Sequence, residues 1–150
     1  EFDIDGIRLD CANVLDFNFM KEMRSQTEAM KEDFWLMGEV IHGDYSRWVN
    51  NEMLHSVTNY ELHKASNSGS MTTNFFEIAH NVKTAGGPSE RQLYTFVDNN
   101  DEDRIATKLK LREHLFPIYI CLFTLPGIPS IYYGGEWGIW KGKRQPNNQR

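Results

Sequence analysis

Five short runs of strand-forming residues recur along the chain, and each run ends at a polar loop. They cover residues 4–11, 34–39, 55–59, 92–97 and 130–132. Short apolar runs that are bounded by polar or turn-forming residues are typical of buried strands. The pattern therefore predicts five short, buried strands.

Helical patterns separate these strands. Residues 16–31 carry apolar side chains, among them Met20 and Met23, at near-helical spacing. Further helices are predicted over residues 45–53, 74–83 and 105–124, of which the last is the longest. Strands that alternate with helices form βαβ units, whose strands run parallel in one sheet. No repeat, linker or second domain is visible, so we expect residues 1–150 to belong to one α/β domain.

The stretch 115–133 contains no charged residue and is long enough to raise the question of a membrane span. Pro117 and the pair Pro126-Gly127 argue against a continuous membrane helix. A break at Pro126-Gly127 divides the stretch into a helix and a buried strand, which is what the inside of a parallel barrel needs. We therefore set the membrane interpretation aside.

Three of the predicted strands lead into a carboxylate: Asp10, Glu39 and Asp101. A carboxylate at one strand end is more often a cap or a loop residue than a catalyst. In a parallel α/β barrel, however, every strand delivers its carboxyl end to the same face, so acids far apart in sequence meet there. Cleavage of an acetal needs two carboxyl groups, one charged and one protonated. Three such strand ends favour a sugar-cleaving site over three unrelated loop residues.

The neighbours of the first two acids suggest how their states would differ. Arg8 stands two residues before Asp10, on the same side of a strand, and would hold Asp10 ionised through a hydrogen bond. Glu39 follows the apolar residues 34–37, which would favour its protonated form.

The segments around these acids resemble the signatures of the α-amylase superfamily, glycoside hydrolase family 13. Residues 5–12 (DGIRLDCA) are similar to the family's second signature, residues 38–40 (GEV) to the third and residues 96–101 (FVDNND) to the fourth, in the same order and spacing. Residues 126–138 resemble its eighth barrel strand and the loop that follows. The resemblance covers nearly the whole chain.

Carried over position by position, the resemblance implies that Asp10 is the nucleophile and Glu39 the general acid/base of a retaining glycoside hydrolase. Asp101 would stabilise the transition state, and Arg8 would orient Asp10. Residues 57–60 (VTNY) and 96–99 (FVDN) look most like the neopullulanase and cyclomaltodextrinase group. The expected activity is hydrolysis of α-1,4 or α-1,6 glucosidic bonds in α-glucans or maltooligosaccharides, through a covalent glycosyl-aspartate intermediate.

One departure concerns the fourth signature, where the family usually has Asn-His-Asp and this chain has Asn99-Asn100-Asp101. The imidazole that would contact the sugar is replaced by the amide of Asn100. This change favours the main alternative, a non-catalytic superfamily member that binds carbohydrate or plays a structural part. Retention of the three acids and Arg8 favours the enzyme.

The larger departure is at the front of the chain. A complete (β/α)8 barrel needs about 250 residues, and strands one to three with the first signature are missing here. The expected fold is thus a partial (β/α)8 TIM barrel that covers about strands four to eight. We expect this segment alone to be inactive, and its unpaired edges to promote self-association.

Further candidates for substrate contact are Asn100, His42 and Arg104; for His42 a plain surface loop is an equally good interpretation. The five histidines show no metal-ligand spacing, so no metal ligands are assigned. We expect no required cofactor and leave the use of Ca²⁺ by the complete enzyme open.

The composition narrows the list of partners. The formal charge is −5 and no Lys/Arg cluster is present, which disfavours nucleic acid as a partner. Cys11 and Cys121 fall in a predicted strand and helix that both look buried, so two separate thiols are expected rather than a disulfide. The chain opens on Glu1 without a recognisable signal peptide, and the compartment is left open.

Overall fold

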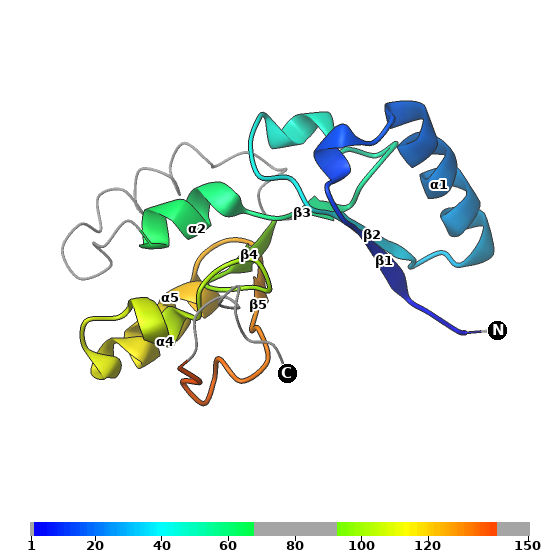
Figure 1. The fold of residues 1–150 in the computed structure, drawn as a ribbon. Helices are drawn as coiled ribbons and strands as arrows, with labels where there is room; N and C mark the ends of the chain where they lie inside the picture. The colour runs from blue at the N-terminus through cyan, green and yellow to red at the C-terminus, as the bar shows by residue number, and fades with distance from the viewer. Residues whose placement is uncertain (1, 68–92, 141–150) are drawn as a thin grey trace, which may run out of the picture.

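The computed structural model describes residues 2–67 and 93–140, in which five parallel strands follow one another along an arc (Figure 1). They are β1 (Gly6–Leu9), β2 (Trp35–Gly38), β3 (Ser56–Val57), β4 (Tyr94–Phe96) and β5 (Ile128–Ser130). Strand β2 lies between β1 and β3, and β4 pairs with β5. A parallel bridge between Thr58 and Tyr94 joins the two groups, so the strands keep their sequence order across the arc.

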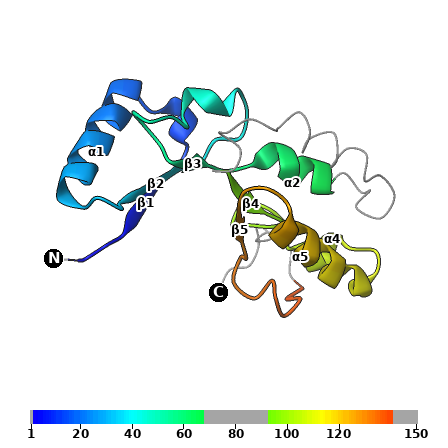
Figure 2. The same ribbon diagram turned by 180° about the vertical axis from the view of Figure 1, so that it is seen from behind.

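Helices lie between the strands in sequence. They are α1 (Phe17–Met30), α2 (Tyr60–Asn67), α4 (Ile105–Lys108) and α5 (Leu115–Thr124), with 3-10 turns η1 (Ala12–Val14), η2 (Tyr45–Arg47) and η4 (Arg112–His114). Both ribbon views place α1 beside β1 and β2, and α4 and α5 beside β4 and β5 (Figures 1 and 2). Parallel strands joined by helices are what the sequence pattern predicts, and this is the architecture of a (β/α)8 barrel segment.

The helix predicted over residues 16–31 is confirmed. Asp16 caps it, because its Oδ1 accepts a hydrogen bond of 3.0 Å from the backbone N–H of Phe19. The prediction of one long helix over residues 105–124 is wrong. A continuous helix would place Pro117 in its interior, whereas in α5 Pro117 occupies the first turn, where no N–H partner is needed.

The prediction of a helix over residues 45–53 is wrong, and one observed helix was not predicted. Residues 45–53 form only the turn η2, and a helix absent from the prediction, α2, begins at Tyr60. The signal for α2 is Asn59, whose Oδ1 accepts a hydrogen bond of 3.0 Å from the N–H of Leu62. The helix predicted over residues 74–83 lies outside the described residues.

Strand β5 begins two residues earlier than predicted because Gly127 turns the chain into it. Gly127 has a φ of 126°, and an added Cβ would lie 2.6 Å from Cγ2 of Thr95 on β4. Only glycine allows both this backbone conformation and this close approach. The strand therefore starts at Ile128, directly after the glycine.

The described residues form two apolar clusters. The larger one lies around β1, β2 and α1 and contains the buried residues Ala12, Met20, Phe34, Leu36, Val40, Trp48, Val49, Met53, Leu54, Val57 and Leu93. The smaller one joins the end of β4 to α4 and α5 and contains Val97, Ile105, Ile118 and Leu122. Each cluster supports one end of the strand arc.

Large apolar side chains of α5 are exposed. Phe116 is 77% exposed and Ile120 is 63% exposed. Such a face favours association, so self-association of this segment stays a prediction. None of the helices in the described residues is long and apolar enough to cross a membrane.

Gly38, at the end of β2, provides a test of the packing that supports Glu39. A Cβ at this position would lie 2.5 Å from Cδ1 of Leu54 and 2.7 Å from the Cβ of Ala12. We predict that Gly38→Ala lowers the free energy of unfolding of the complete protein by about 1–3 kcal/mol, the usual cost of overpacking. Urea denaturation of this variant beside Asn18→Ala, an exposed helix position, measures the effect. Equal stability of the two variants would contradict it.

Candidate active site

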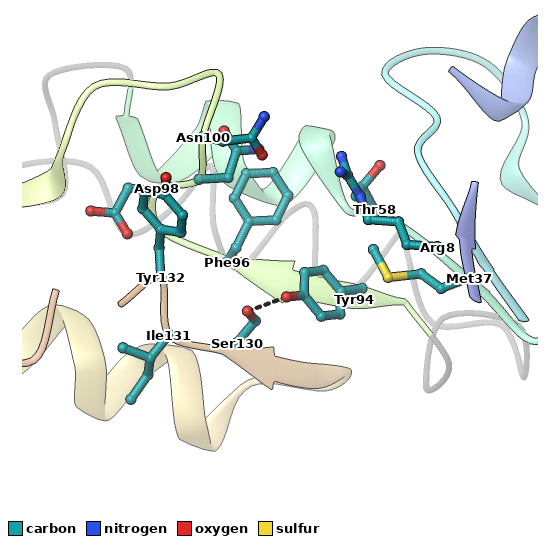
Figure 3. Close-up of a pocket in the computed structure, with 11 residues that line it drawn as sticks. Arg8, Met37, Thr58, Tyr94, Phe96, Asp98, Asn100, Ser130, Ile131 and Tyr132 are labelled. Carbon is teal, nitrogen blue, oxygen red and sulfur yellow. Dashed lines mark hydrogen bonds between the residues drawn. The ribbon is translucent and has the colours of Figure 1, made fainter. Parts of the chain in front are cut away.

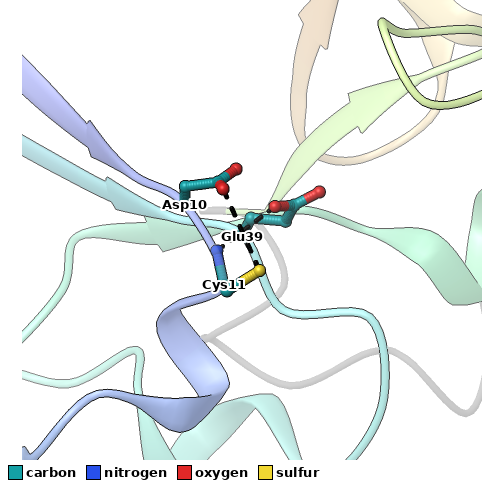
Figure 4. A group of neighbouring side chains, drawn as sticks. All are labelled: Asp10, Cys11 and Glu39. Atoms are coloured by element: carbon teal, nitrogen blue, oxygen red, sulfur yellow. Dashed lines mark hydrogen bonds between the residues drawn. The ribbon is translucent and has the colours of Figure 1, made fainter.

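The ends of β1 and β2 bring the first two predicted acids together. The pairing of Leu9 with Gly38 places Asp10 and Glu39 directly after neighbouring strand positions. Two backbone hydrogen bonds of 2.8 Å hold this junction, from the N–H of Glu39 to the carbonyl of Leu9 and from the N–H of Ala12 to the carbonyl of Glu39. As a result, a carboxylate oxygen of Asp10 lies within 4.8 Å of one of Glu39 (Figure 4).

The two carboxylates differ strongly in exposure. The side chain of Asp10 is 78% exposed, whereas that of Glu39 is 6% exposed. Glu39 faces three donors at the long end of hydrogen-bonding distance. The hydroxyl of Tyr60 and Nη2 of Arg8 lie 3.3 and 3.4 Å from its Oε1, and the N–H of Cys11 lies 3.3 Å from its Oε2.

The guanidinium of Arg8 lies closer to Glu39 than to Asp10. Its Nη2 lies 3.4 Å from Glu39 and 3.8 Å from Asp10, so the expected hydrogen bond from Arg8 to Asp10 is wrong in this geometry. Arg8 and Asp10 do share one side of β1, as the alternation of side chains along a strand requires. Glu39, which follows the neighbouring strand β2, adds a second carboxylate on that side, and the guanidinium of Arg8 is near both Asp10 and Glu39.

Cys11 links the two acids through its own backbone and side chain. Its φ of 47° is left-handed, which is uncommon for a residue other than glycine. Its Sγ lies 3.9 Å from Oδ2 of Asp10 (Figure 4). The thiol is exposed, so the expectation that Cys11 is buried in a strand is wrong: the strand ends at Leu9. Cys121 is half-buried, and both cysteines are free, as predicted.

All three predicted acids act on this thiol. The negative charge of Asp10 raises the pKa of Cys11 most, followed by desolvation and by the charges of Glu39 and Asp101. Arg8 opposes them.

The loop after β4 carries Asp101. Asn99 shapes this loop, because its Oδ1 accepts hydrogen bonds of 2.9 Å from the N–H groups of Asp101 and Glu102. Asn100 is exposed, and its Nδ2 donates a hydrogen bond of 2.9 Å to Oδ2 of Asp101. The asparagine that replaces the family's histidine is therefore bound to the third acid.

A cavity of about 140 Å³ opens beside these groups at the carboxyl ends of the strands (Figure 3). Its lining residues come from four strands, β1, β2, β4 and β5, and from the segments that follow β3, β4 and β5: Arg8, Met37, Thr58, Tyr94, Phe96, Asp98, Asn99, Asn100, Ser130, Ile131 and Tyr132. The hydroxyls of Tyr94 and Ser130 are hydrogen-bonded across its floor. Of the predicted site residues, Arg8 and Asn100 line this cavity, whereas the acids Asp10, Glu39 and Asp101 lie outside its lining.

His42 and Arg104, the other two predicted contact residues, do not line this cavity. His42 is exposed, and its Nδ1 lies 2.9 Å from Nζ of Lys64. Arg104 is buried, with its guanidinium 4.1 and 4.7 Å from the ring centres of Tyr132 and Tyr133 and with Nη1 donating a hydrogen bond of 2.6 Å to the carbonyl of Tyr133. These contacts make Arg104 a clamp for the loop after β5, and its guanidinium lies outside the cavity lining. Its assignment as a substrate contact stays a prediction.

The arrangement of Asp10, Cys11 and Glu39 is the one group of potential metal ligands found in the described residues. Arg8 already supplies a positive charge to both carboxylates. We therefore assign no metal to this group.

The sequence analysis missed three polar residues that support the site: Tyr60, Asn99 and Asp98. Tyr60 and Asn99 lie in residues 57–60 and 96–99, which entered the sequence analysis only through their resemblance to the neopullulanase and cyclomaltodextrinase group. Asp98 is buried, its Oδ2 accepts a hydrogen bond of 2.9 Å from the N–H of Ile105 at the start of α4, and its Oδ1 has no partner in the described residues. An aspartate seven positions before an apolar helix gives no capping signal in sequence.

The fold and the strand-end carboxylates define a segment of a parallel α/β barrel with an acidic site. A model of the family described as "Alpha amylase, catalytic domain" matches residues 1–149. The chain therefore belongs to the α-amylase family, as its signatures predict.

Individual proteins agree with this assignment. A maltogenic α-amylase of Bacillus acidopullulyticus is 32% identical over 150 residues, which cover 95% of this chain and 25% of that protein. A cyclomaltodextrinase of Geobacillus thermopakistaniensis is 30% identical, with coverage of 95% and 25%. The structure of an α-amylase from Geobacillus thermoleovorans, complexed with acarbose, has a TM-score of 0.83 at 25% identity and covers 95% of this chain and 34% of its own.

These matches confirm the predicted placement near the cyclomaltodextrinase group. The chain spans about a quarter of the length of the curated relatives it matches.

Asp98 provides a test of the electrostatics beside the cavity. Burial raises the pKa of Asp98, and the hydrogen bond from Ile105 and the charge of Arg104 only partly offset it. The folded state thus favours the protonated form, and stability is lost as pH rises above the ordinary pKa of the unfolded chain and through the raised one. Asparagine does not ionise. We predict that the stability of Asp98→Asn relative to the wild type increases from about pH 3 to about pH 7.

Melting temperatures at several pH values check this prediction. Asp33→Asn, which changes an exposed carboxylate in the loop before β2, is the control and should show no such trend. A relative stability of Asp98→Asn that falls with pH would show that the ionised form is the favoured one.

Proposed function

We propose that the complete protein is a retaining glycoside hydrolase that acts on α-1,4 or α-1,6 glucosidic bonds of α-glucans. The observation that carries the proposal is the pair Asp10 and Glu39, one exposed and one buried, with oxygens within 4.8 Å of each other. Retaining glycosidases have carboxyl groups about 5–5.5 Å apart, whereas inverting enzymes need a wider gap for a water molecule. The close pair supports a double displacement.

In the first step the carboxylate of Asp10 attacks the anomeric carbon, and Glu39 gives its proton to the glycosidic oxygen as that bond breaks. In the second step Glu39 removes a proton from water, the water oxygen bonds to the anomeric carbon, and the bond to Asp10 breaks. The exposure of Asp10 suits a nucleophile that must reach a sugar.

Asp101 would stabilise the positive charge that develops on the sugar ring. Its loop is linked to Glu39, because Asn99 binds both the N–H of Asp101 and the hydroxyl of Tyr60, which donates to Glu39. Arg8 would balance the charges of Asp10 and Glu39 together rather than orient Asp10 alone. The cavity would hold part of the substrate next to the acids, because Arg8, which lies beside Asp10 and Glu39, lines it. The relatives' names, maltogenic α-amylase and cyclomaltodextrinase, favour maltooligosaccharides as that substrate.

The proposed reaction uses no cofactor, and Ca²⁺ use by the complete protein is left open. We propose that the segment 1–150 is inactive by itself, because further barrel strands would be needed to complete the walls of the site and fix the bound sugar.

Removal of either acid tests the mechanism in the complete protein. We predict that Asp10→Asn and Glu39→Gln each lower kcat on maltooligosaccharides by about three orders of magnitude or more, because each step needs its own carboxyl group. The matched controls are Asp33→Asn and Glu32→Gln, exposed acids at the opposite end of β2, which should retain activity. NMR of the first products should show retained anomeric configuration. Inverted products would rule out the covalent intermediate.

The alternative, a non-catalytic binding or structural member of the family, is favoured by Asn100 alone. An asparagine amide donates a hydrogen bond but stays neutral and reaches less far than a histidine ring. If the enzyme interpretation holds, we predict that Asn100→His raises kcat/KM on α-1,4-glucans about tenfold, equivalent to about 1.4 kcal/mol of transition-state stabilisation.

Asn100→Ala is the companion variant, because it removes the bond to Asp101 without adding a ring. A histidine variant that is no more active than the wild type would mean that Asn100 suits a different ligand. Wild-type protein that binds glucans without turnover would establish the non-catalytic alternative.

A further inference from the structure

Tyr60 lies between the general acid and the loop of the third acid. It is 4% exposed, and its hydroxyl makes two hydrogen bonds of opposite sense. The hydroxyl donates to Oε1 of Glu39 at 3.3 Å and accepts from Nδ2 of Asn99 at 2.9 Å. A phenol has one proton to donate, so the bond from Asn99 directs that proton towards Glu39.

The ring of Tyr60 has little freedom to move away from Glu39. Its centroid lies 5.0 Å from that of Phe96 and 5.8 Å from that of His63, both in edge-to-face contact. Phe96 is the last residue of β4, so the ring is held by the strand that leads to Asn99. Burial also raises the pKa of Tyr60, which keeps the hydroxyl a donor.

Asn99 uses both ends of its amide. Nδ2 donates to Tyr60, while Oδ1 accepts from the backbone N–H groups of Asp101 and Glu102. The two accepted bonds fix which end is the oxygen. The side chain of Asn99 thus fixes the direction in which the Tyr60 hydroxyl donates its hydrogen bond. It also fixes the backbone conformation of the loop that carries Asp101.

Resting on the function proposed above, we infer that Tyr60 and Asn99 are positioning residues that align Glu39 with the Asp101 loop. The hydroxyl of Tyr60 stabilises the carboxylate that Glu39 becomes when it gives up its proton. Asn99 keeps that hydroxyl aimed at Glu39 and holds Asp101 in place. The pair therefore assists the step in which the leaving group is protonated.

The test compares variants of the complete protein on two substrates. Tyr60→Phe removes the hydroxyl. Asn99→Asp keeps an oxygen for the loop N–H groups but replaces the donor with an acceptor, which would draw the hydroxyl proton away from Glu39. Tyr45→Phe is the matched control, because the hydroxyl of Tyr45 accepts backbone N–H groups at the start of α2, from Tyr60 and, at 3.3 Å, from Glu61, and in the described residues it makes no hydrogen bond to a carboxylate.

Maltotriose has a leaving group that needs protonation, whereas α-maltosyl fluoride has one that does not. We expect Tyr60→Phe and Asn99→Asp to lower kcat/KM on maltotriose by roughly ten- to a hundredfold, the range for loss of a hydrogen bond to a charged group, and on the fluoride by less than about threefold. The double variant should lose about as much as the more impaired single variant, because both changes interrupt one chain of bonds. Tyr45→Phe should change neither substrate.

Equal losses on both substrates, or wild-type behaviour of Asn99→Asp, would overturn the positioning roles while leaving the proposed function intact. Circular dichroism of each variant separates a loss of fold from a loss of alignment, and Asn99→Asp carries the test if Tyr60→Phe unfolds. A wild-type protein that turns over neither substrate would overturn the proposed function, and the positioning roles with it.

Discussion

The parallel pairing of β1 with β2 is the interaction on which the rest of the site depends. Two backbone hydrogen bonds of 2.8 Å connect the strand ends across Leu9, Ala12 and Glu39. The register places Asp10 and Glu39 side by side at the carboxyl ends of the two strands. A shift by one residue would turn every side chain of a strand to the other face. The separation of the two acids is therefore a property of the sheet.

The same junction is built from unusually close contacts. Gly38 leaves no room for a side chain between Leu54 and Ala12, and Cys11 adopts a left-handed backbone. The left-handed turn at Cys11 follows directly on Asp10, and the N–H of Cys11 lies 3.3 Å from Oε2 of Glu39. Backbone strain of this kind is retained where the surrounding structure imposes it and is often found at functional sites.

A second junction lies between β3 and β4, where backbone pairing is sparse. The bridge between Thr58 and Tyr94 is continued by a hydrogen bond of 2.9 Å from the N–H of Asn59 to the carbonyl of Tyr94. Side chains extend the connection, because Tyr60 reaches Glu39 on one side and Asn99 on the other. The polar network of the site thus crosses the place where the strand arc has the fewest backbone bonds.

The sequence by itself determined the alternation of strands and helices, the helix over residues 16–31 and the position of two acids at strand ends, because these depend on local pattern and on neighbours in the chain. Signature segments also identified the family. Only the tertiary structure decided which carboxylate Arg8 approaches, that Cys11 is exposed and that Arg104 clamps a loop. It also revealed Tyr60 and Asn99 as partners. Those contacts join residues from different strands, and their geometry depends on register and packing, which a single sequence does not encode locally.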